Sequence, residues 1–337
     1  MKHANIPIFI PHLGCPNACV FCNQRSISGK EAFHEETVRS EIERALETIG
    51  NKKETEIAFF GGSFTGIERG LMVRLLEVAK SYIDVGRVQS VRLSTRPDYI
   101  DREVLDILSR YGVKHIELGL QSMDDDVLRL SRRGHDAACG ERACRLVKEY
   151  GFSLVGQMMI GLPGSDIGKE KRTAEKLCEL GVDAVRIYPT VVFRDTDLCR
   201  MTERGEYVPL TLDDATKRTK IALSVFVEHN VPCIRVGLCA SERLSSDGDV
   251  VGGATHSAIG ELAMSALYYD RICTELDRMG NISGKCAVIS VSAGSTSKAV
   301  GQKRVNVLEI CKKYSLKRVK ILEKKEVLGY NIIIDLI

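Results

Sequence analysis

The chain lacks tryptophan entirely and carries little net charge of either sign. Its 337 residues contain 48 basic and 45 acidic side chains, which leave a formal net charge of +3. A charge this small does not by itself indicate binding to a polyanion, so a nucleic-acid site would have to come from local clustering. No run approaches the ~18 consecutive apolar residues that a membrane span needs. We therefore expect no membrane-embedded segment.

A secretory signal and a disulfide framework are also missing. Residues 1–5 lead directly into a strand-like segment without an apolar signal-peptide region. Twelve cysteines are many, but the chain is large and has its own apolar core, which is untypical of a disulfide-stapled secreted domain. Nine of them are scattered and are interpreted as reduced, mostly buried side chains. We expect a cytoplasmic protein.

Strand-like and helix-like segments alternate along most of the chain. The short apolar strand-like runs are 6–10, 56–60, 90–93, 115–120, 154–160 and 184–188. The amphipathic stretches, with apolar residues three and four apart, are 36–49, 71–83, 101–111, 138–150, 168–180 and 212–230. Six such units predict an α/β fold, a partial (β/α)6 TIM-like barrel whose site lies at the carboxyl ends of the strands.

Three regions are expected along the chain. Residues 1–235 form the barrel, and residues 236–284 a loop and helix extension in which the Ser-, Asp- and Gly-rich segment 241–253 is interpreted as a loop. Residues 285–337 are predicted to form a small basic α/β appendage. Its expected elements are a strand at 286–292, a helix at 298–314, and strands at 319–322 and 330–336.

The most informative motif follows the first expected strand. Cys15, Cys19 and Cys22 have the spacing C-x3-C-x2-C, and Phe21 precedes the last of them. Three thiolates can bind three irons of a [4Fe–4S] cluster and leave the fourth iron open, whereas electron-transfer clusters use four cysteines. Two alternatives remain: a structural zinc site, which needs a fourth ligand such as His12, and three unrelated buried cysteines.

This loop resembles the radical S-adenosylmethionine (SAM) superfamily. The resemblance implies that Cys15, Cys19 and Cys22 hold a [4Fe–4S] cluster whose open iron binds SAM. It further implies that SAM is cleaved reductively to a 5′-deoxyadenosyl radical, with the electron supplied by a partner such as flavodoxin or ferredoxin. The cofactor then carries the chemistry, and the protein supplies position and electrostatics.

Over roughly residues 6–260 the chain looks like the radical SAM core of the Elongator catalytic subunit and, more distantly, like oxygen-independent coproporphyrinogen oxidases. By this resemblance the SAM-contacting residues would be Phe21, Gly61, Gly62, Ser63, Thr95, Gln121, Arg133, Gln157 and Leu162. If the resemblance is set aside, the glycine pair is equally consistent with an ordinary turn, and Arg133 with a solvated charged residue at the end of a helix. Gln157 stands where the oxidases carry an aspartate.

The catalytic residues are not identified by the sequence, but three candidates stand out. Tyr188, in the sixth strand, is similar to an Elongator-type residue expected to face the substrate. His256 and Glu261 could form an acid–base pair, or simply a charge pair at the start of a helix. The acetyltransferase domain of Elongator catalytic subunits has no counterpart in this chain, so no acetyl-transfer chemistry is expected.

The segment 303–325 is strongly basic, with nine lysines and arginines against two glutamates. It could form a patch for tRNA phosphates, or a solvated surface of lysines. The leading hypothesis is a radical SAM enzyme that modifies tRNA or another RNA. The alternatives are a radical SAM enzyme acting on a small molecule or cofactor precursor, and a non-catalytic iron–sulfur sensor or scaffold.

Overall fold

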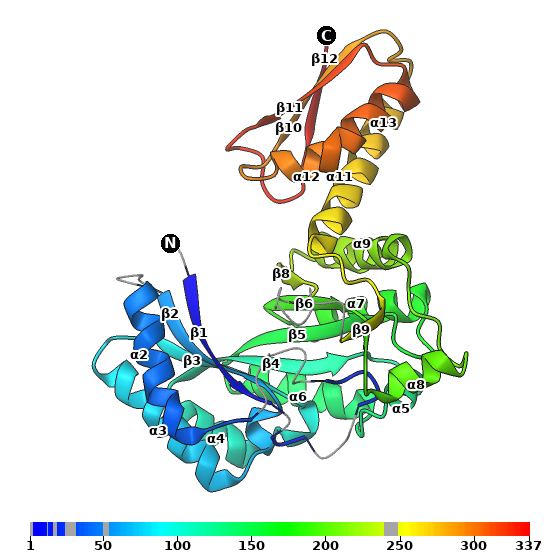
Figure 1. The fold of residues 1–337 in the computed structure, drawn as a ribbon. Helices are drawn as coiled ribbons and strands as arrows, with labels where there is room; N and C mark the ends of the chain where they lie inside the picture. The colour runs from blue at the N-terminus through cyan, green and yellow to red at the C-terminus, as the bar shows by residue number, and fades with distance from the viewer. Residues whose placement is uncertain (1–2, 12, 16–18, 24–31, 50–53, 239–248) are drawn as a thin grey trace.

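The computed structural model describes residues 3–11, 13–15, 19–23, 32–49, 54–238 and 249–337. At its centre is a curved sheet in which every neighbouring pair of strands is parallel, in the order β1-β2-β3-β4-β5-β6-β8 (Figure 1). The strands are β1 His3–Ile10, β2 Glu54–Gly61, β3 Ser90–Thr95, β4 Val113–Gln121, β5 Ser153–Ile160, β6 Ala184–Pro189 and β8 Cys233–Val236. This open parallel sheet confirms the predicted partial barrel.

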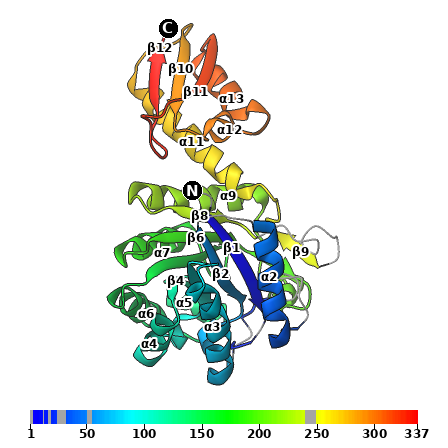
Figure 2. The ribbon, with the colours of Figure 1, turned by 90° about the vertical axis from the view of Figure 1, so that its left-hand side faces the viewer.

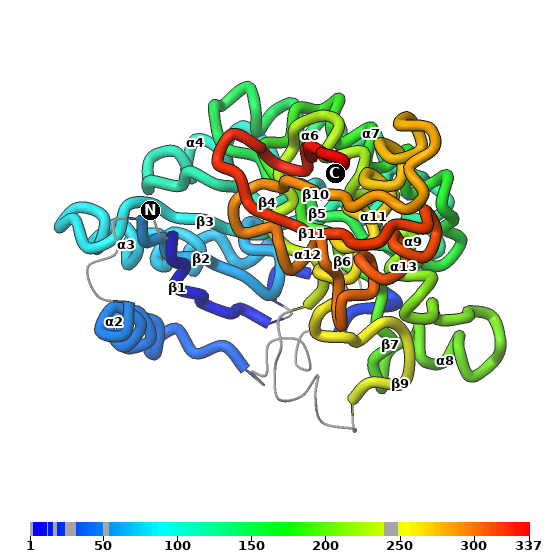
Figure 3. The backbone as a smooth tube through the Cα atoms, turned by 90° about the horizontal axis from the view of Figure 1, so that it is seen from above, coloured from blue at the N-terminus to red at the C-terminus, as the bar shows by residue number. Residues whose placement is uncertain are grey.

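Helices follow the strands and cover the outer side of the curved sheet (Figure 3). They are α2 Val38–Ile49, α3 Arg69–Asp84, α4 Arg102–Arg110, α6 Ala137–Glu149, α7 Ile167–Glu179 and α9 Leu212–Glu228. Two shorter helices, α5 Asp125–Leu130 and α8 Asp197–Glu203, contribute no residue to the main apolar core of the described structure. Short 3₁₀ turns lie at Glu35–Thr37, Phe64–Gly66 and Pro97–Tyr99. Asp101, Asp136 and Asp166 each accept a hydrogen bond from a backbone N–H of the first helical turn, which fixes where α4, α6 and α7 begin.

The two faces of the sheet differ in polarity. Ile57, Phe59 and Leu93 point outward and are fully buried against the helices in one continuous apolar core. Because successive strand residues point to opposite faces, their neighbours Glu56 and Arg92 point into the barrel. The outer face therefore stabilises the fold by burying apolar surface, and the inner face is left for polar side chains.

Two short features at the open edge differ from the sequence-based expectation. Strand β8 adds a seventh strand that was not predicted. The segment 241–253 was expected to be a loop. For its last four residues this is wrong, because they form strand β9, Val250–Gly253, which pairs antiparallel with β7, Val191–Phe193. A strand of four residues is too short for its sequence to show the alternation of apolar and polar residues that predicts a strand. Gly253 permits the pairing, because a Cβ there would lie 2.5 Å from the Thr190 carbonyl oxygen. Residues 241–248 lie outside the described part of the chain.

The appendage has its own small core. Helix α11, Ile259–Arg278, leads to a sheet of order β11-β10-β12, formed by β10 Cys286–Val291, β11 Arg318–Glu323 and β12 Ile333–Leu336. The single helix expected at 298–314 is instead two, α12 Thr296–Val300 and α13 Val305–Tyr314, joined by a 3₁₀ turn at Gln302–Arg304. Gly301, Lys303 and Arg304 all have positive φ there, which an α-helix cannot accommodate.

Two views place the appendage beyond the end of the barrel where β1 begins, joined to it by α11 (Figures 1 and 2). The contact is reinforced by Tyr330, whose ring centroid lies 5.0 Å from that of Tyr268 and which packs against both the barrel core and the appendage core. None of the described helices is long and apolar enough to cross a membrane.

Candidate cluster and cofactor site

The three motif cysteines lie on the segment that leaves the carboxyl end of β1. Cys19 is buried and Cys22 is half-buried, and the Cys22 N–H donates to the Cys19 carbonyl oxygen at 3.0 Å. Residues 16–18, between the first and second cysteine, lie outside the described part of the chain. Within the residues described, no three or more His, Cys, Asp and Glu side chains are gathered as they would be around a metal ion. The role of the cysteines as cluster ligands stays a prediction.

Two buried arginines lie beside these thiols. Arg133, only 5% exposed, donates from Nη1 to Cys19 Sγ at 3.2 Å and from Nη2 to the Gly119 carbonyl oxygen at 2.5 Å. Arg96, 4% exposed, donates to the Arg133 carbonyl oxygen and forms an ion pair with Asp98 at 2.7 Å. Cys15 is exposed at the surface, yet desolvation by the surrounding chain and the neighbouring Cys19 raise the pKa of its thiol, while the two arginines act in the opposite direction.

The glycine pair after β2 holds the cysteine segment in place. A Cβ on Gly62 would lie 2.2 Å from the Leu13 carbonyl oxygen and 2.8 Å from that of Ile10, so no other residue fits without movement. Ser63 N–H donates to the Leu13 oxygen at 3.1 Å, and the Ser63 hydroxyl accepts from Arg96 N–H at 3.0 Å. Gly61 has φ +108°. The motif predicted to meet SAM thus also positions Cys15.

The other predicted cofactor residues occupy the carboxyl ends of neighbouring strands. Thr95 is buried and lies 2.6 Å from the Thr65 hydroxyl, and Leu162 is buried in the turn after β5. Gln121 has φ 66° at the end of β4, and its Oε1 is buried without a hydrogen-bond partner among the described residues. Phe21 packs against a small apolar cluster that includes Val20 and residues of the β7–α8 region. The structure brings these residues to one end of the barrel.

Gln157 belongs to a polar network inside the barrel that the sequence motifs did not reveal. Its Nε2 donates to Glu117 Oε2 at 2.8 Å, and Glu117 is fully buried. The other Glu117 oxygen accepts from Arg92 Nη1 at 3.2 Å and from Arg186 Nη2 at 2.8 Å. A signal was present in the sequence: Arg92 and Arg186 are each the only charged residue of a short, largely apolar strand, at an inward position.

The network continues toward the amino end of the strands through Glu56. Its carboxylate lies 2.7 Å from His3 Nε2, 3.1 Å from His115 Nε2 and 3.0 Å from Arg92 Nη2, and it accepts from the Ser90 hydroxyl at 2.5 Å. Burial raises the pKa of Glu56, but the hydrogen bonds from His115 and Ser90, together with the charge of Arg92, outweigh it and hold that pKa far below its usual range. Glu56 and Glu117 thus link the arginines Arg92 and Arg186 in one chain of ion pairs along the inner face of the barrel.

The three catalytic candidates lie in different surroundings. Tyr188 is on β6, two residues beyond Arg186 and on the same inward face, and burial raises the pKa of its phenol. His256 and Glu261 are exposed at the start of α11, and His256 Nδ1 accepts from the Ala258 N–H at 3.1 Å. No hydrogen bond or ion pair joins His256 to Glu261 in the described structure. His256 therefore bonds to the turn that precedes α11, and the two side chains are not joined as an acid–base pair among the described residues.

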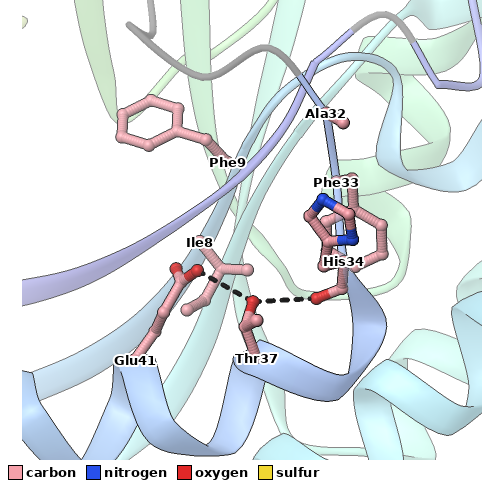
Figure 4. A pocket seen from close by; sticks show the side chains of 7 residues that line it. All are labelled: Ile8, Phe9, Ala32, Phe33, His34, Thr37 and Glu41. Carbon is pink, nitrogen blue, oxygen red and sulfur yellow. Dashed lines mark hydrogen bonds between the residues drawn. The ribbon is translucent and has the colours of Figure 1, made fainter.

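A small pocket lies apart from these residues, between β1 and α2 (Figure 4). Its polar contacts are internal: the Thr37 hydroxyl donates to the His34 carbonyl oxygen at 2.9 Å and to Glu41 at 3.1 Å. The lining residues are Ile8, Phe9, Ala32, Phe33, His34, Thr37 and Glu41. It contains none of the residues that the motifs single out.

The residues at the cysteine segment fit a cluster and a bound carboxylate. Arg133 Nε, Arg96 Nη1 and Gln121 Oε1 are all buried without a partner among the described residues, which is costly unless a ligand satisfies them. Thiolates suit iron, and buried guanidinium groups offset the negative charge that a thiolate-bound cluster and a carboxylate bring. Cys15, Cys19 and Cys22 would hold the cluster, with Arg133 and Gln121 beside it.

A curved parallel half-barrel with three thiols after its first strand is the arrangement that a radical SAM enzyme would have. The radical SAM superfamily model matches residues 9–177, and the radical SAM C-terminal domain model matches residues 182–268. The chain belongs to the radical SAM superfamily. It is a radical SAM enzyme, and its cofactors are a [4Fe–4S] cluster and SAM.

Its relatives include proteins of assigned and unassigned activity. An uncharacterised protein of Methanocaldococcus jannaschii is 32% identical over 258 residues, 73% of this chain and 76% of that protein. A tRNA uridine(34) acetyltransferase of Methanocaldococcus infernus is 29% identical over 208 residues, but these are 56% of this chain and only 39% of the relative. The resemblance to the Elongator family is confirmed, and the chain spans less than half the length of such a relative.

Two solved structures share the fold. The archaeal Elp3 of Methanocaldococcus infernus, lacking its N-terminal residues, superposes with a TM-score of 0.60 at 22% identity, covering 81% of this chain and 63% of that one. Coproporphyrinogen III oxidase from Escherichia coli gives a TM-score of 0.52 at 17% identity, covering 68% and 53%. Both likenesses support the barrel architecture predicted from the sequence.

Proposed function

We propose that this radical SAM enzyme modifies tRNA, with the basic appendage binding the RNA and the barrel holding the nucleotide that reacts. One group of relatives is named for a reaction on uridine 34 of tRNA. The observation that carries the proposal is the charge of the appendage, because phosphate binding needs clustered cations that are not already neutralised.

The basic side chains of the appendage are accessible and lack acidic partners. Of the nine in segment 303–325, eight are exposed and Lys324 is half-buried. No ion pair involving any of them is found in the described structure. Arg318 and Lys320 alternate with Val319, whose side chain is in the appendage core, so both project from the opposite face of β11. Lys312 and Lys313 add charge at the end of α13.

The position of this patch favours a long substrate. The appendage stands beyond the amino end of β1, whereas the cysteine segment leaves its carboxyl end (Figure 1). A small molecule cannot contact both places at once, but a folded RNA can. Such a substrate would be held by phosphate contacts far from the nucleotide that reacts, and these contacts contribute affinity without reading sequence.

Within the barrel the chain's own residues provide position and charge. Cys15, Cys19 and Cys22 would hold the cluster, and Arg133 and Gln121 would orient the SAM carboxylate and ribose. When bound, the cluster and SAM supply reductive cleavage of the sulfonium and an organic radical. An electron donor such as flavodoxin or ferredoxin would reduce the cluster. The polar inner face, centred on Glu117, would hold the substrate group under attack.

The decisive experiment compares charge removal on the appendage with matched charge removal elsewhere. A variant with Lys312, Lys313, Arg318 and Lys320 all changed to Gln should bind total tRNA at least about tenfold more weakly, with a shallower dependence on salt. The control changes four exposed basic residues of the barrel helices, Arg129, Arg145, Lys171 and Lys217, to Gln. Equal affinity of both variants for tRNA, or RNA-independent turnover of SAM with a small substrate, would contradict the proposal.

A further inference from the structure

The open edge of the barrel carries two arginines side by side on its inner face. Arg186 on β6 is the register partner of Arg235 on β8, at an irregularity in the pairing. Ile187 pairs with Val236, one residue further along each strand, and both side chains pack against the outer apolar cores. Arg186 and Arg235 therefore point inward together. Two like charges directly opposite each other repel unless something compensates them.

Only one of the two has a carboxylate partner. Arg186 donates to Glu117 at 2.8 Å, and its guanidinium lies 5.5 Å from the centroid of the Phe60 ring. Arg235 is half-buried, and in the described residues its guanidinium has neither an ion pair nor a hydrogen bond. The two buried carboxylates of the network are already shared, Glu56 by Arg92 and Glu117 by Arg92 and Arg186. One positive charge is left over inside the barrel.

Two further donors surround this excess charge. Arg186 Nε is buried without a hydrogen-bond partner, although its Nη2 is paired. Tyr188 stands two residues beyond Arg186 on the same inward face of β6, and the charges of both arginines act on its phenol. A hydroxyl and guanidinium N–H groups that converge from two strands match the oxygens of a phosphate or carboxylate, which accept several charge-assisted hydrogen bonds at once.

We infer that Arg235, Arg186 and Tyr188 form an oxyanion subsite inside the barrel, which holds a phosphate or carboxylate group of the substrate. The inference rests on the proposed function only for the identity of that group: if the substrate is tRNA, it is a phosphate next to the reacting nucleotide. The subsite lies at the edge of the sheet, where the barrel is open and a substrate too large for a closed barrel can still enter. It binds the substrate and is separate from the residues beside the cysteines.

The first test measures thermal unfolding of the anaerobically reconstituted full chain while phosphate replaces chloride at constant ionic strength. An anion that binds the folded state raises the melting temperature of the wild type with concentration. The Arg235→Gln variant should be at least as stable as the wild type without phosphate, because a repulsion is relieved, and should lose the phosphate-dependent rise. Arg278→Gln, which removes an exposed guanidinium at the end of α11, is the matched control and should keep it.

The anion used identifies the source of the group. A larger rise with phosphate than with acetate indicates a nucleotide phosphate, and the reverse indicates a small carboxylate substrate, which would support the subsite while contradicting the tRNA proposal. In a direct titration, Arg235→Gln should weaken phosphate binding about tenfold, the usual effect of losing a charge-assisted pair. Equal rises in wild type and Arg235→Gln, or no rise with either anion, would overturn the inference.

Discussion

Arg133 donates a hydrogen bond to the sulfur of Cys19 across 3.2 Å, although the two residues are 114 positions apart. The contact joins the turn after α5 to the segment after β1, and it aims a buried cation at one of the three thiols. Hydrogen bonds to thiolate sulfurs raise the reduction potential of an iron–sulfur cluster, since they stabilise negative charge on the ligands. Arg133 is therefore placed to act on the cluster itself as well as on SAM.

Replacing Arg133 by Gln should lower the reduction potential of the cluster. The change removes the charged N–H donor to Cys19 and leaves the ligand itself intact. The measurement is a redox titration followed by EPR on reconstituted protein. The adjacent Arg132→Gln is the control, because Arg132 is exposed and pairs with Asp197 on the surface. A potential unchanged in Arg133→Gln would show that the contact to Cys19 has no influence on the cluster.

Replacing Glu117 by Ala should destabilise the fold strongly. Two guanidinium groups, of Arg92 and Arg186, would lose their shared carboxylate in a buried site, which costs about 3 to 5 kcal/mol. The free energy of unfolding from urea titration measures this. Glu149→Ala breaks an exposed pair with Arg102 and should change stability by about 0.5 kcal/mol or less. Similar losses in both variants would contradict the central role of Glu117.

Replacing Gly62 by Ala should impair cluster assembly more than stability. The added methyl would meet the Leu13 carbonyl oxygen at 2.2 Å and displace the segment that leads to Cys15. Iron bound per chain after anaerobic reconstitution is the measurement. Gly151→Ala is the control: its Cβ would meet nothing within 4 Å, so it only strains a φ of +79°, at a cost of about 1 to 2 kcal/mol. Full iron content in Gly62→Ala would refute this role of the glycine.

His135 should make the protein sensitive to acid. Burial, and next the charge of Arg133, lower the pKa of His135 from 6.5 to about 4. Between these values the unfolded chain binds a proton that the folded chain does not, so stability falls as the pH drops from 6.5 toward 4, by at most about 3 kcal/mol. Unfolding free energies of wild type and His135→Asn across this range should diverge. Parallel pH profiles would show that His135 titrates normally.

Local patterns in the sequence determined the main elements and the identity of the enzyme class. Six alternating strand-like and helix-like segments predicted the half-barrel, because a helix between two successive strands lets them pair in parallel with the helix packed outside. The spacing of Cys15, Cys19 and Cys22 indicated the cluster loop for an equally local reason, since three ligands on one short segment need no other part of the chain.

Contacts across the sheet were decided only by the tertiary structure. Nothing local shows that Glu117 is shared by Arg92 and Arg186, or that Arg235 stands beside Arg186 without a carboxylate, because strand register brings together residues far apart in sequence. Gly62 allows the Leu13 carbonyl oxygen to approach closely, and Arg133 donates to the Cys19 sulfur. Both roles depend on residues that are distant in sequence and close in space. Sequence period sets which way a side chain points, and packing of the whole fold sets what it meets.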